Sequence, residues 1–186
     1  MLLESSENSL HLAPPIAVDT QAVRPKVAKV KKRGLNKLLG LRRVLVETKR
    51  RLYLRAMGMD IDPTAEFSLS ARFDKTFPIG VHLGRKSYVA FDAVILTHDR
   101  TRGLYLHTRI GEKCFIGARS MLMPGVSVGD GSIVGAGSVV TKDVPPGSMV
   151  AGNPARIIAS GIRVDDYGRM AGADETETKL VLRGLA

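Results

Sequence analysis

The chain has 186 residues and a formal net charge of +10, from 28 lysines and arginines against 18 acidic residues. This length is typical of one domain with enough chain to bury a hydrophobic core. The single cysteine, Cys114, excludes an internal disulfide and favours a reducing, cytoplasmic compartment. No apolar run is long enough for a spanning helix, and the first residues lack the basic and apolar regions of a secretory signal.

Residues 1–25 mix serine, proline and acidic residues without a sustained period, which predicts a disordered or loosely held arm. The positive charge follows this arm. Residues 24–58 hold 13 basic residues and one acid, a net of +12, whereas the rest holds 15 basic and 17 acidic residues, a net of −2. Leucines at helical spacing within residues 34–58 predict one or two helices, so residues 26–60 form a basic helical segment.

A basic amphipathic helix is typical of proteins that lie on anionic membranes. We therefore expect residues 24–58 either to hold the protein on the inner face of a membrane or to form a solvated helical cap. Nucleic-acid binding is the other use of such charge, but only Tyr53 interrupts it with an aromatic ring, and no stacking platform for bases is present. No specific nucleic acid is therefore expected as a partner.

From Ile61 a six-residue period organises the sequence, and its fifth position is usually a small residue. Each unit predicts one short strand and one turn, with the first residue pointing inward and a frequent glycine at the second position relieving the turn. The period is interrupted at residues 79–82 and again at residues 101–109, the latter a candidate functional loop. All twelve first positions are apolar: Ile61, Phe67, Phe73, Leu83, Val89, Ile95, Ile110, Ile116, Leu122, Val128, Val134 and Val140.

The stretch IGEKCFIGARSMLMPGVSVGDGSIVGAGSVVTKDVPPGSMVAGNPARI, residues 110–157, resembles the hexapeptide-repeat acyltransferases, and within them the sugar and polysaccharide-biosynthesis O-acetyltransferases. The resemblance implies a mainly β fold, a left-handed parallel β-helix of about four turns over residues 61–157, after the N-terminal α-helical segment. Handedness comes only from the resemblance, because parallel crossovers are normally right-handed. Residues 158–186 form a C-terminal extension. The resemblance also implies a homotrimer with sites between neighbouring copies, acetyl-CoA as donor, and no metal.

Acetyl transfer to a hydroxyl needs a base for the hydroxyl proton, and histidine exchanges protons near neutral pH. The chain has four histidines. His98 precedes the nine-residue insertion, where the family carries its base, so the resemblance implies that His98 is catalytic. His107 closes the insertion and is a candidate for contact with the acceptor. His82 is expected at the surface, and His11 lies in the arm.

Two aspartates accompany this base. Asp99 follows His98 directly, and Asp92 occupies a corner one unit earlier. Each is a candidate for binding acceptor hydroxyls or for orienting His98, although a solvated turn carboxylate is the simpler interpretation of each one alone. Cys114 sits at a small fifth position and is expected to fill the core, so direct transfer without an acyl-enzyme is expected.

The donor site follows from the same resemblance. The backbone at Ala118 and Ala136 matches positions that hold the pantetheine arm, with the amides of the glycines before them as weaker candidates for oxyanion donors. Thr141, Lys142 and Arg156 match positions that face the nucleotide end of CoA, where positive charge suits phosphate.

The leading hypothesis is O-acetyl transfer to a small or lipid-linked sugar in polysaccharide or glycolipid biosynthesis. N-acetyl transfer to an amino sugar or amino acid would use the same base and groove. A zinc enzyme of the γ-carbonic anhydrase type requires closely spaced histidines, and the loop between His98 and His107 separates these two. The alternative of another class is a non-catalytic β-helix whose basic segment binds membrane or nucleic acid.

Overall fold

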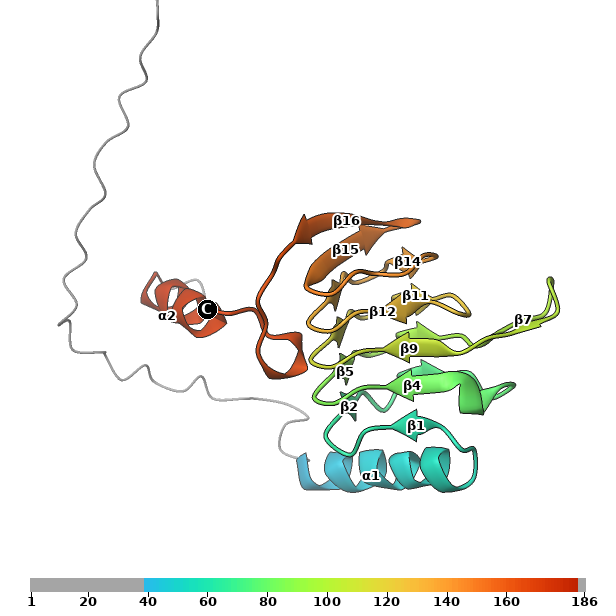
Figure 1. The fold of residues 1–186 in the computed structure, drawn as a ribbon. Coiled ribbons are helices and arrows are strands. Elements are labelled where there is room, and N and C mark those ends of the chain that lie inside the picture. Colours follow the sequence, from blue (N-terminus) through green and yellow to red (C-terminus); the bar gives the residue numbers. More distant parts are fainter. Residues whose placement is uncertain (1–38, 184–186) are drawn as a thin grey trace, which may run out of the picture. The chain divides into compact units, whose positions relative to one another are not determined.

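A computed structural model describes residues 39–183, so the loose arm expected at residues 1–25 and the first part of the basic segment lie outside the described residues. The described chain is a left-handed parallel β-helix, with a helix at one end of the stack and a strand pair at the other (Figure 1). Neither helix in this range has the length and apolar character needed to cross a bilayer.

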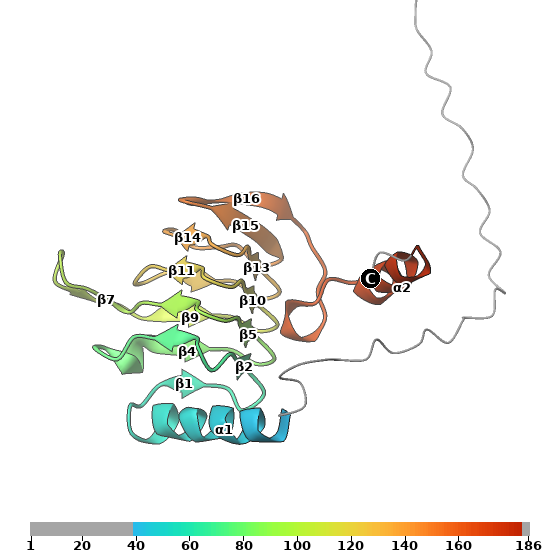
Figure 2. The same cartoon turned by 180° about the vertical axis from the view of Figure 1, so that it is seen from behind.

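Strands of two or three residues follow one another around each coil and pair in parallel with the coils above and below. Figure 2 shows the second and third sheets from behind. The first sheet contains β1 (Asp60–Ile61), β4 (Val81–Leu83), β9 (Thr108–Ile110) and β12 (Ser127–Val128). The second contains β2 (Glu66–Phe67), β5 (Tyr88–Val89), β10 (Phe115–Ile116), β13 (Ile133–Val134), β15 (Ser148–Gly152) and β16 (Ala155–Ser160). The third contains β3 (Arg72–Phe73), β6 (Val94–Ile95), β11 (Met121–Leu122) and β14 (Val139–Val140).

The core is the column of side chains that the six-residue period predicts. All twelve first-position residues are buried, none more than 4% exposed, and the small fifth-position residues such as Ala65, Cys114 and Ser132 are buried beside them. One unit has too little apolar surface to fold alone, so stacking of coils supplies the hydrophobic stabilisation.

The second-position glycines have a different role from the one predicted. They do not adopt left-handed backbone angles; instead, a Cβ on Gly84 would lie 2.5 Å from the carbonyl oxygen of Gly111 in the next coil. The left-handed residue of the turn is at the fourth position, as at Lys86 (φ 54°) and Arg119 (φ 57°). Glycine at the second position therefore permits close approach of coils and does not relieve the turn.

Helix α1 (Leu39–Arg55) confirms a helix within the basic segment and covers the open end of the first coil. Tyr53 packs edge-on against Phe73, with ring centroids 5.5 Å apart. Arg50 donates hydrogen bonds to the carbonyl oxygens of Asp62 (2.8 Å), Pro63 (3.1 Å) and Ala65. An end coil would otherwise leave unpaired backbone groups, and α1 supplies donors for them.

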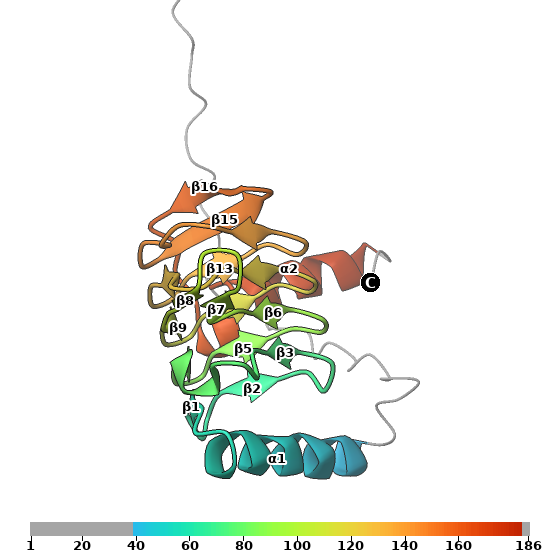
Figure 3. The same ribbon diagram turned by 90° about the vertical axis from the view of Figure 1, so that its right-hand side faces the viewer.

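Both interruptions of the period leave the stack at the same corner, between the third and first sheets. The first contains the short helix η2 (Pro78–Gly80), and the second forms an antiparallel hairpin of β7 (His98–Asp99) and β8 (Leu104–Tyr105). The hairpin projects from the stack and faces the viewer in Figure 3. It begins earlier than the loop expected at residues 101–109: the Leu96 amide still donates to the Leu122 carbonyl of the next coil (3.1 Å), and the hairpin strand β7 begins at His98.

The C-terminal extension runs back along the corner between the first and second sheets. The Ile162 amide donates to the Gly147 carbonyl (2.9 Å), and the Tyr167 amide to the Lys86 carbonyl (2.7 Å). Here η3 (Asp166–Gly168) precedes α2 (Ala173–Leu182). The extension thus connects several coils along the corner between the first and second sheets, whereas the hairpin leaves the stack at the corner between the third and first sheets.

Candidate active site

His98 and a buried aspartate form a hydrogen-bonded pair at the base of the hairpin. The His98 Nδ1 atom lies 2.5 Å from Oδ2 of Asp74, whose side chain is 3% exposed. The His98 side chain is 28% exposed, and its Nε2 atom has no hydrogen-bond partner within residues 39–183. Because a carboxylate accepts hydrogen bonds, Nδ1 carries the proton and the lone pair of Nε2 faces outward.

Asp74 is held ionised by the backbone around it. Burial alone would raise its pKa, but the amides of Thr97 (2.9 Å) and His98 (3.0 Å) donate to Oδ2 and the Thr76 amide donates to Oδ1 (2.8 Å). Together with the bond to His98, these donors outweigh burial and hold the pKa of Asp74 well below its usual range. A fixed negative charge therefore lies at the Nδ1 edge of the imidazole.

Sequence reasoning missed Asp74 and looked to Asp99 and Asp92 for the orienting carboxylate. Asp99 instead accepts hydrogen bonds from Thr101 (2.6 Å) and Arg102 (2.6 Å), which hold its pKa well below its usual range. Asp92 lies at the corner between the second and third sheets, 3.9 Å from Arg119. The register of the repeat offered a usable signal: Asp74 follows Phe73, which pairs with Ile95 of the next coil, three residues before His98.

A row of rings joins His98 to the second candidate histidine. The His98 ring stacks at 6.4 Å from Tyr105, Tyr105 lies edge-on at 5.7 Å from Phe77, and Phe77 at 5.6 Å from His107. The hydroxyl of Thr97 donates to the Phe77 carbonyl (2.7 Å), which fixes this segment against the hairpin base. Neither Phe77 nor Tyr105 was singled out from the sequence.

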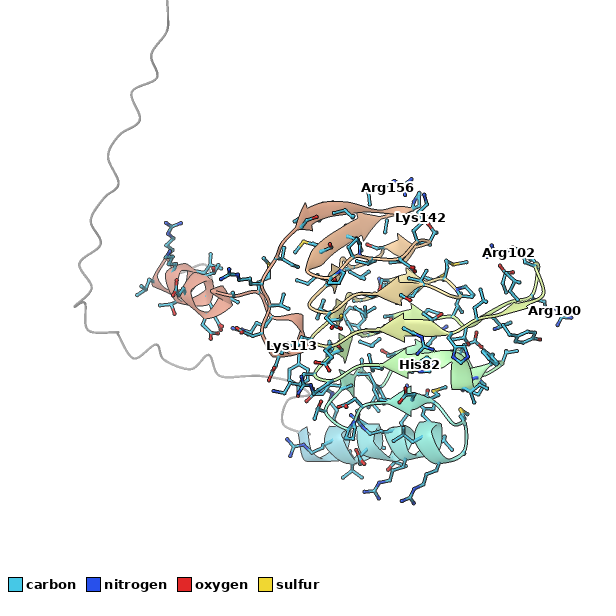
Figure 4. All side chains as sticks on the ribbon, viewed as in Figure 1. His82, Arg100, Arg102, Lys113, Lys142 and Arg156 are labelled. Carbon is cyan, nitrogen blue, oxygen red and sulfur yellow. The ribbon has the colours of Figure 1, made fainter. Side chains whose placement is uncertain are left out.

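His82, expected as an ordinary surface residue, is in fact bonded on both sides. Its Nε2 atom lies 2.7 Å from Nδ1 of His107, and its Nδ1 atom 2.9 Å from Oδ2 of Asp60. Figure 4 places His82 on the face of the stack, beside the base of the hairpin that carries Arg100 and Arg102. Within residues 39–183, no three His, Cys, Asp or Glu side chains are arranged to hold a metal ion.

The predicted donor residues lie at two different corners. Ala118 follows β10 and Ala136 follows β13, and the Gly137 amide donates to the Ala118 carbonyl (2.8 Å), so both stack at the corner between the second and third sheets. Thr141 and Lys142 follow β14, at the corner of the stack that also carries His98. One copy of the chain therefore does not gather all of these residues in one place.

The two predicted cations are exposed, near the end of the stack that is farthest from α1 (Figure 4). Arg156 on β16 donates only to the carbonyl of Ala155 (3.1 Å) among the described residues, and Lys142 lies in an exposed turn. Cys114 is fully buried, and burial raises the pKa of its thiol to about 11. It fills the core and has none of the thiolate character of a nucleophile.

Known proteins share this repeat. The family model described as "Hexapeptide repeat of succinyl-transferase" matches residues 107–142. The "Putative acetyltransferase YvoF" of Bacillus subtilis (strain 168) is 37% identical over 109 residues, 58% of this chain and 63% of the relative. The galactoside O-acetyltransferase of Escherichia coli (strain K12) is 51% identical over 49 residues, 26% of this chain and 24% of the relative. The chain thus spans less than two thirds of these relatives.

A crystal structure of a maltose O-acetyltransferase from Clostridium difficile 630 is 25% identical, with a TM-score of 0.48 over 68% of this chain and 90% of that one.

Proposed function

Because the repeat-bearing part of the chain is that of a hexapeptide-repeat acyltransferase, we propose that the protein moves an acetyl group from acetyl-CoA to a sugar hydroxyl, in polysaccharide or glycolipid biosynthesis. The observation that carries this proposal is the pair of His98 and Asp74. It combines a histidine of fixed tautomer, an outward lone pair on Nε2 and an ionised carboxylate at Nδ1. This is the arrangement of a general base.

His98 acts twice in the proposed reaction. Its Nε2 atom takes the proton of the acceptor hydroxyl as the hydroxyl oxygen forms a bond to the acetyl carbonyl carbon. As the bond from that carbon to sulfur breaks, Nε2 returns the proton to the departing thiolate. Asp74 stabilises the imidazolium between these two steps, because its carboxylate remains ionised against Nδ1. The buried Cys114 takes no part, so the acetyl group passes directly from donor to acceptor.

The residues assigned to the donor fit a CoA molecule in size and charge. Ala118 and Ala136 present small side chains and backbone groups on adjacent coils, which suits an extended pantetheine arm. Lys142 and Arg156 are exposed cations that carry no carboxylate partner among the described residues, which suits phosphates. The donor supplies an activated thioester when bound.

The two-corner arrangement supports a homotrimer. His98 and Lys142 lie at one corner of the triangular stack, whereas Ala118 and Ala136 lie at the next. If one donor molecule contacts both sets, the second set comes from a neighbouring copy, and a ring of three copies repeats this contact with closed symmetry. Mass measurement in solution tests this point directly.

The proposed activity is tested by release of free CoA thiol from acetyl-CoA with a panel of neutral glycosides, amino sugars and amino acids. We expect transfer to a sugar hydroxyl, reduced by about 10²–10⁴-fold in His98→Ala. An active His98→Ala variant with intact mass and fold would disprove the assignment of the base. Acetylation of amines alone would replace the O-transfer assignment with N-transfer.

Helix α1 supports a peripheral contact with an anionic membrane, on which a lipid-linked acceptor would be presented. The helix carries two apolar stripes: one packs on the stack through Val46 and Tyr53, and the other is exposed. The outer stripe consists of Leu41, Val44, Leu45 and Leu52, which are 46–61% exposed. The exposed Arg42, Arg43, Arg51 and Arg55 accompany it, and charges of this sign favour anionic lipid.

Vesicle sedimentation separates this membrane contact from a merely solvated cap. We expect the wild type to sediment with vesicles of phosphatidylserine and phosphatidylcholine at low salt, and a Leu41→Ser, Leu45→Ser, Leu52→Ser variant to remain in the supernatant. A variant with Leu180→Ser and Leu182→Ser on α2 controls for loss of exposed leucine elsewhere. Equal binding of all three proteins, or of none, would contradict the membrane contact.

A further inference from the structure

Three side chains beside the proposed base form a chain of hydrogen bonds that the transfer reaction does not require. We propose that Asp60 and His82 hold His107 as a second acceptor-binding side chain, and that the acceptor is a sugar whose ring lies on the exposed Tyr105 between His107 and His98. This inference rests on the proposed acetyl transfer to a sugar and adds the subsite that binds the acceptor ring.

The hairpin base places His107 on the same face as His98. His98 pairs with Tyr105 across the hairpin, and the Leu106 amide donates to the Thr97 carbonyl (2.8 Å), so the antiparallel register continues inward. Successive side chains of a strand alternate between faces, and residues 105 and 107 therefore share the face that carries His98. The hydroxyl of Thr108 donates to the Leu96 carbonyl (2.6 Å) and anchors the segment on the other side of His107.

The hydrogen-bonded chain fixes the tautomer of His107. The Asp60 carboxylate accepts from Nδ1 of His82 (2.9 Å), which leaves Nε2 of a neutral His82 as an acceptor. That atom lies 2.7 Å from Nδ1 of His107, which must then carry the hydrogen. The lone pair of His107 is thus on Nε2, which has no partner among the described residues. This histidine presents an acceptor atom for a hydroxyl, as His98 does.

The hydrogen bonds that join Asp60, His82 and His107 contribute little to the stability of the fold. The Asp60 side chain is 77% exposed and His107 is exposed as well, while the His82 side chain between them is 17% exposed, so both ends of the hydrogen-bonded row are open to water. Hydrogen bonds between groups that water can reach contribute only about 0.5–1.5 kcal/mol each to stability. The ordering is better explained by a ligand, since a binding site gains affinity when its side chains are fixed before the ligand arrives.

The surface between the two histidines suits a sugar ring. Tyr105 is 59% exposed and stacks beside His98, while Phe77 lies edge-on to both Tyr105 and His107, so the aromatic surface of these two rings runs between two imidazoles that can each accept a hydrogen bond. A pyranose has an apolar face of C–H groups and a rim of hydroxyl donors. The ring face would pack on Tyr105, with one hydroxyl donating to His107 and the reacting hydroxyl donating to His98.

The test measures steady-state acetylation of the methyl glucoside, methyl galactoside or methyl mannoside that the wild type acetylates fastest. We expect His107→Ala, Tyr105→Ala and Asp60→Ala each to raise the acceptor KM about 10-fold while kcat changes less than about threefold, since they remove uniform binding. The KM for acetyl-CoA should not change. The conservative variants should have the wild-type KM, because Asp60→Asn keeps an accepting oxygen and Tyr105→Phe keeps the ring.

A binding measurement without turnover separates this inference from the proposed activity. The same glycoside should bind His98→Ala by ligand-detected NMR, and this binding should disappear when Tyr105→Ala or His107→Ala is added. Unchanged acceptor KM in all three variants, with unaltered melting temperatures, would overturn the subsite. His98-dependent transfer to acceptors that are not sugars would leave the base in place and also overturn it. Absence of any acetyl transfer by the wild type would contradict the proposed function. Absence of glycoside binding by His98→Ala would contradict the subsite.

Discussion

Asp74 and His98 lie 24 residues apart in sequence, on successive coils at one corner, and their side chains meet at 2.5 Å. The repeat makes such contacts between coils simple to build. Asp74 stands one residue beyond the end of β3, and His98 follows β6, which pairs with β3 in the same sheet. The stacking that buries the core thus also fixes the distance between the two groups that the proposed chemistry needs.

Replacing the buried carboxylate by an amide should cost activity without unfolding the protein. We expect Asp74→Asn to lower kcat about 10²-fold or more, because the neutral amide no longer stabilises the imidazolium and need not select the same His98 tautomer. Steady-state acetyl transfer checks this outcome. Asp166→Asn, which removes a carboxylate from an exposed ion pair with Lys86, is the matched control and should keep full activity. Equal activity of both variants would contradict the role of Asp74.

The same substitution should change how stability depends on pH. The pKa of Asp74 is below its unfolded value, so its contribution to the free energy of unfolding is complete above about pH 4 and is lost as the pH falls toward the folded pKa. The difference in unfolding free energy between wild type and Asp74→Asn should therefore shrink as the pH falls below about 4. Urea titrations at several pH values measure it. A difference that stays constant down to pH 3 would mean that the carboxyl is not stabilised in its ionised form.

The six-residue period was sufficient to predict the coils, because every apolar first-position residue must be buried in the core of the stack. Leu83 and Ile110, for example, are buried one above the other in the first sheet, as the register requires. The number of turns and the helix at the N-terminal side were also predicted correctly. The period could not show that Gly84 is needed for contact with the next coil, since that contact is between residues distant in sequence.

The partners of the histidines were less accessible from the sequence. Asp99 and Asp92 were the candidates for the orienting carboxylate because both lie near His98 in sequence. Asp99 is adjacent to His98 on β7, however, and adjacent residues of a strand point to opposite faces. Asp74 and Asp60 reach their histidines across coils, so sequence distance hid both pairs. The register of the repeat contains this information, provided that the length of each interruption is known.

Close packing of coils predicts an unusually costly glycine substitution. A Cβ on Gly84 would lie 2.5 Å from the oxygen and 2.6 Å from the carbon of the Gly111 carbonyl, and backbone cannot move aside as a side chain can. We expect Gly84→Ala to lower the free energy of unfolding by about 2 kcal/mol or more. Arg119→Gly tests the other kind of position: its left-handed φ of 57° favours glycine, so it should be neutral or up to about 1 kcal/mol more stable. Chemical denaturation compares the two, and similar losses in both would contradict this distinction.

Arg50 should contribute more to stability than the other arginines of α1. Its side chain is 9% exposed and donates to carbonyls of the first coil, including those of Asp62 and Pro63. The Arg51 side chain is 68% exposed, and its one polar contact among residues 39–183 is with Glu47. Arg50→Met keeps most of the side-chain volume but removes the donors to these carbonyls, among them the buried carbonyl of Ala65. We expect it to lower the free energy of unfolding by about 2–4 kcal/mol, and Arg51→Met by less than about 0.5 kcal/mol. Hydrogen exchange should locate the loss in α1 and the first coil, since the later coils have their own neighbours. Equal stability of the two variants would show that α1 covers the end of the stack without holding it.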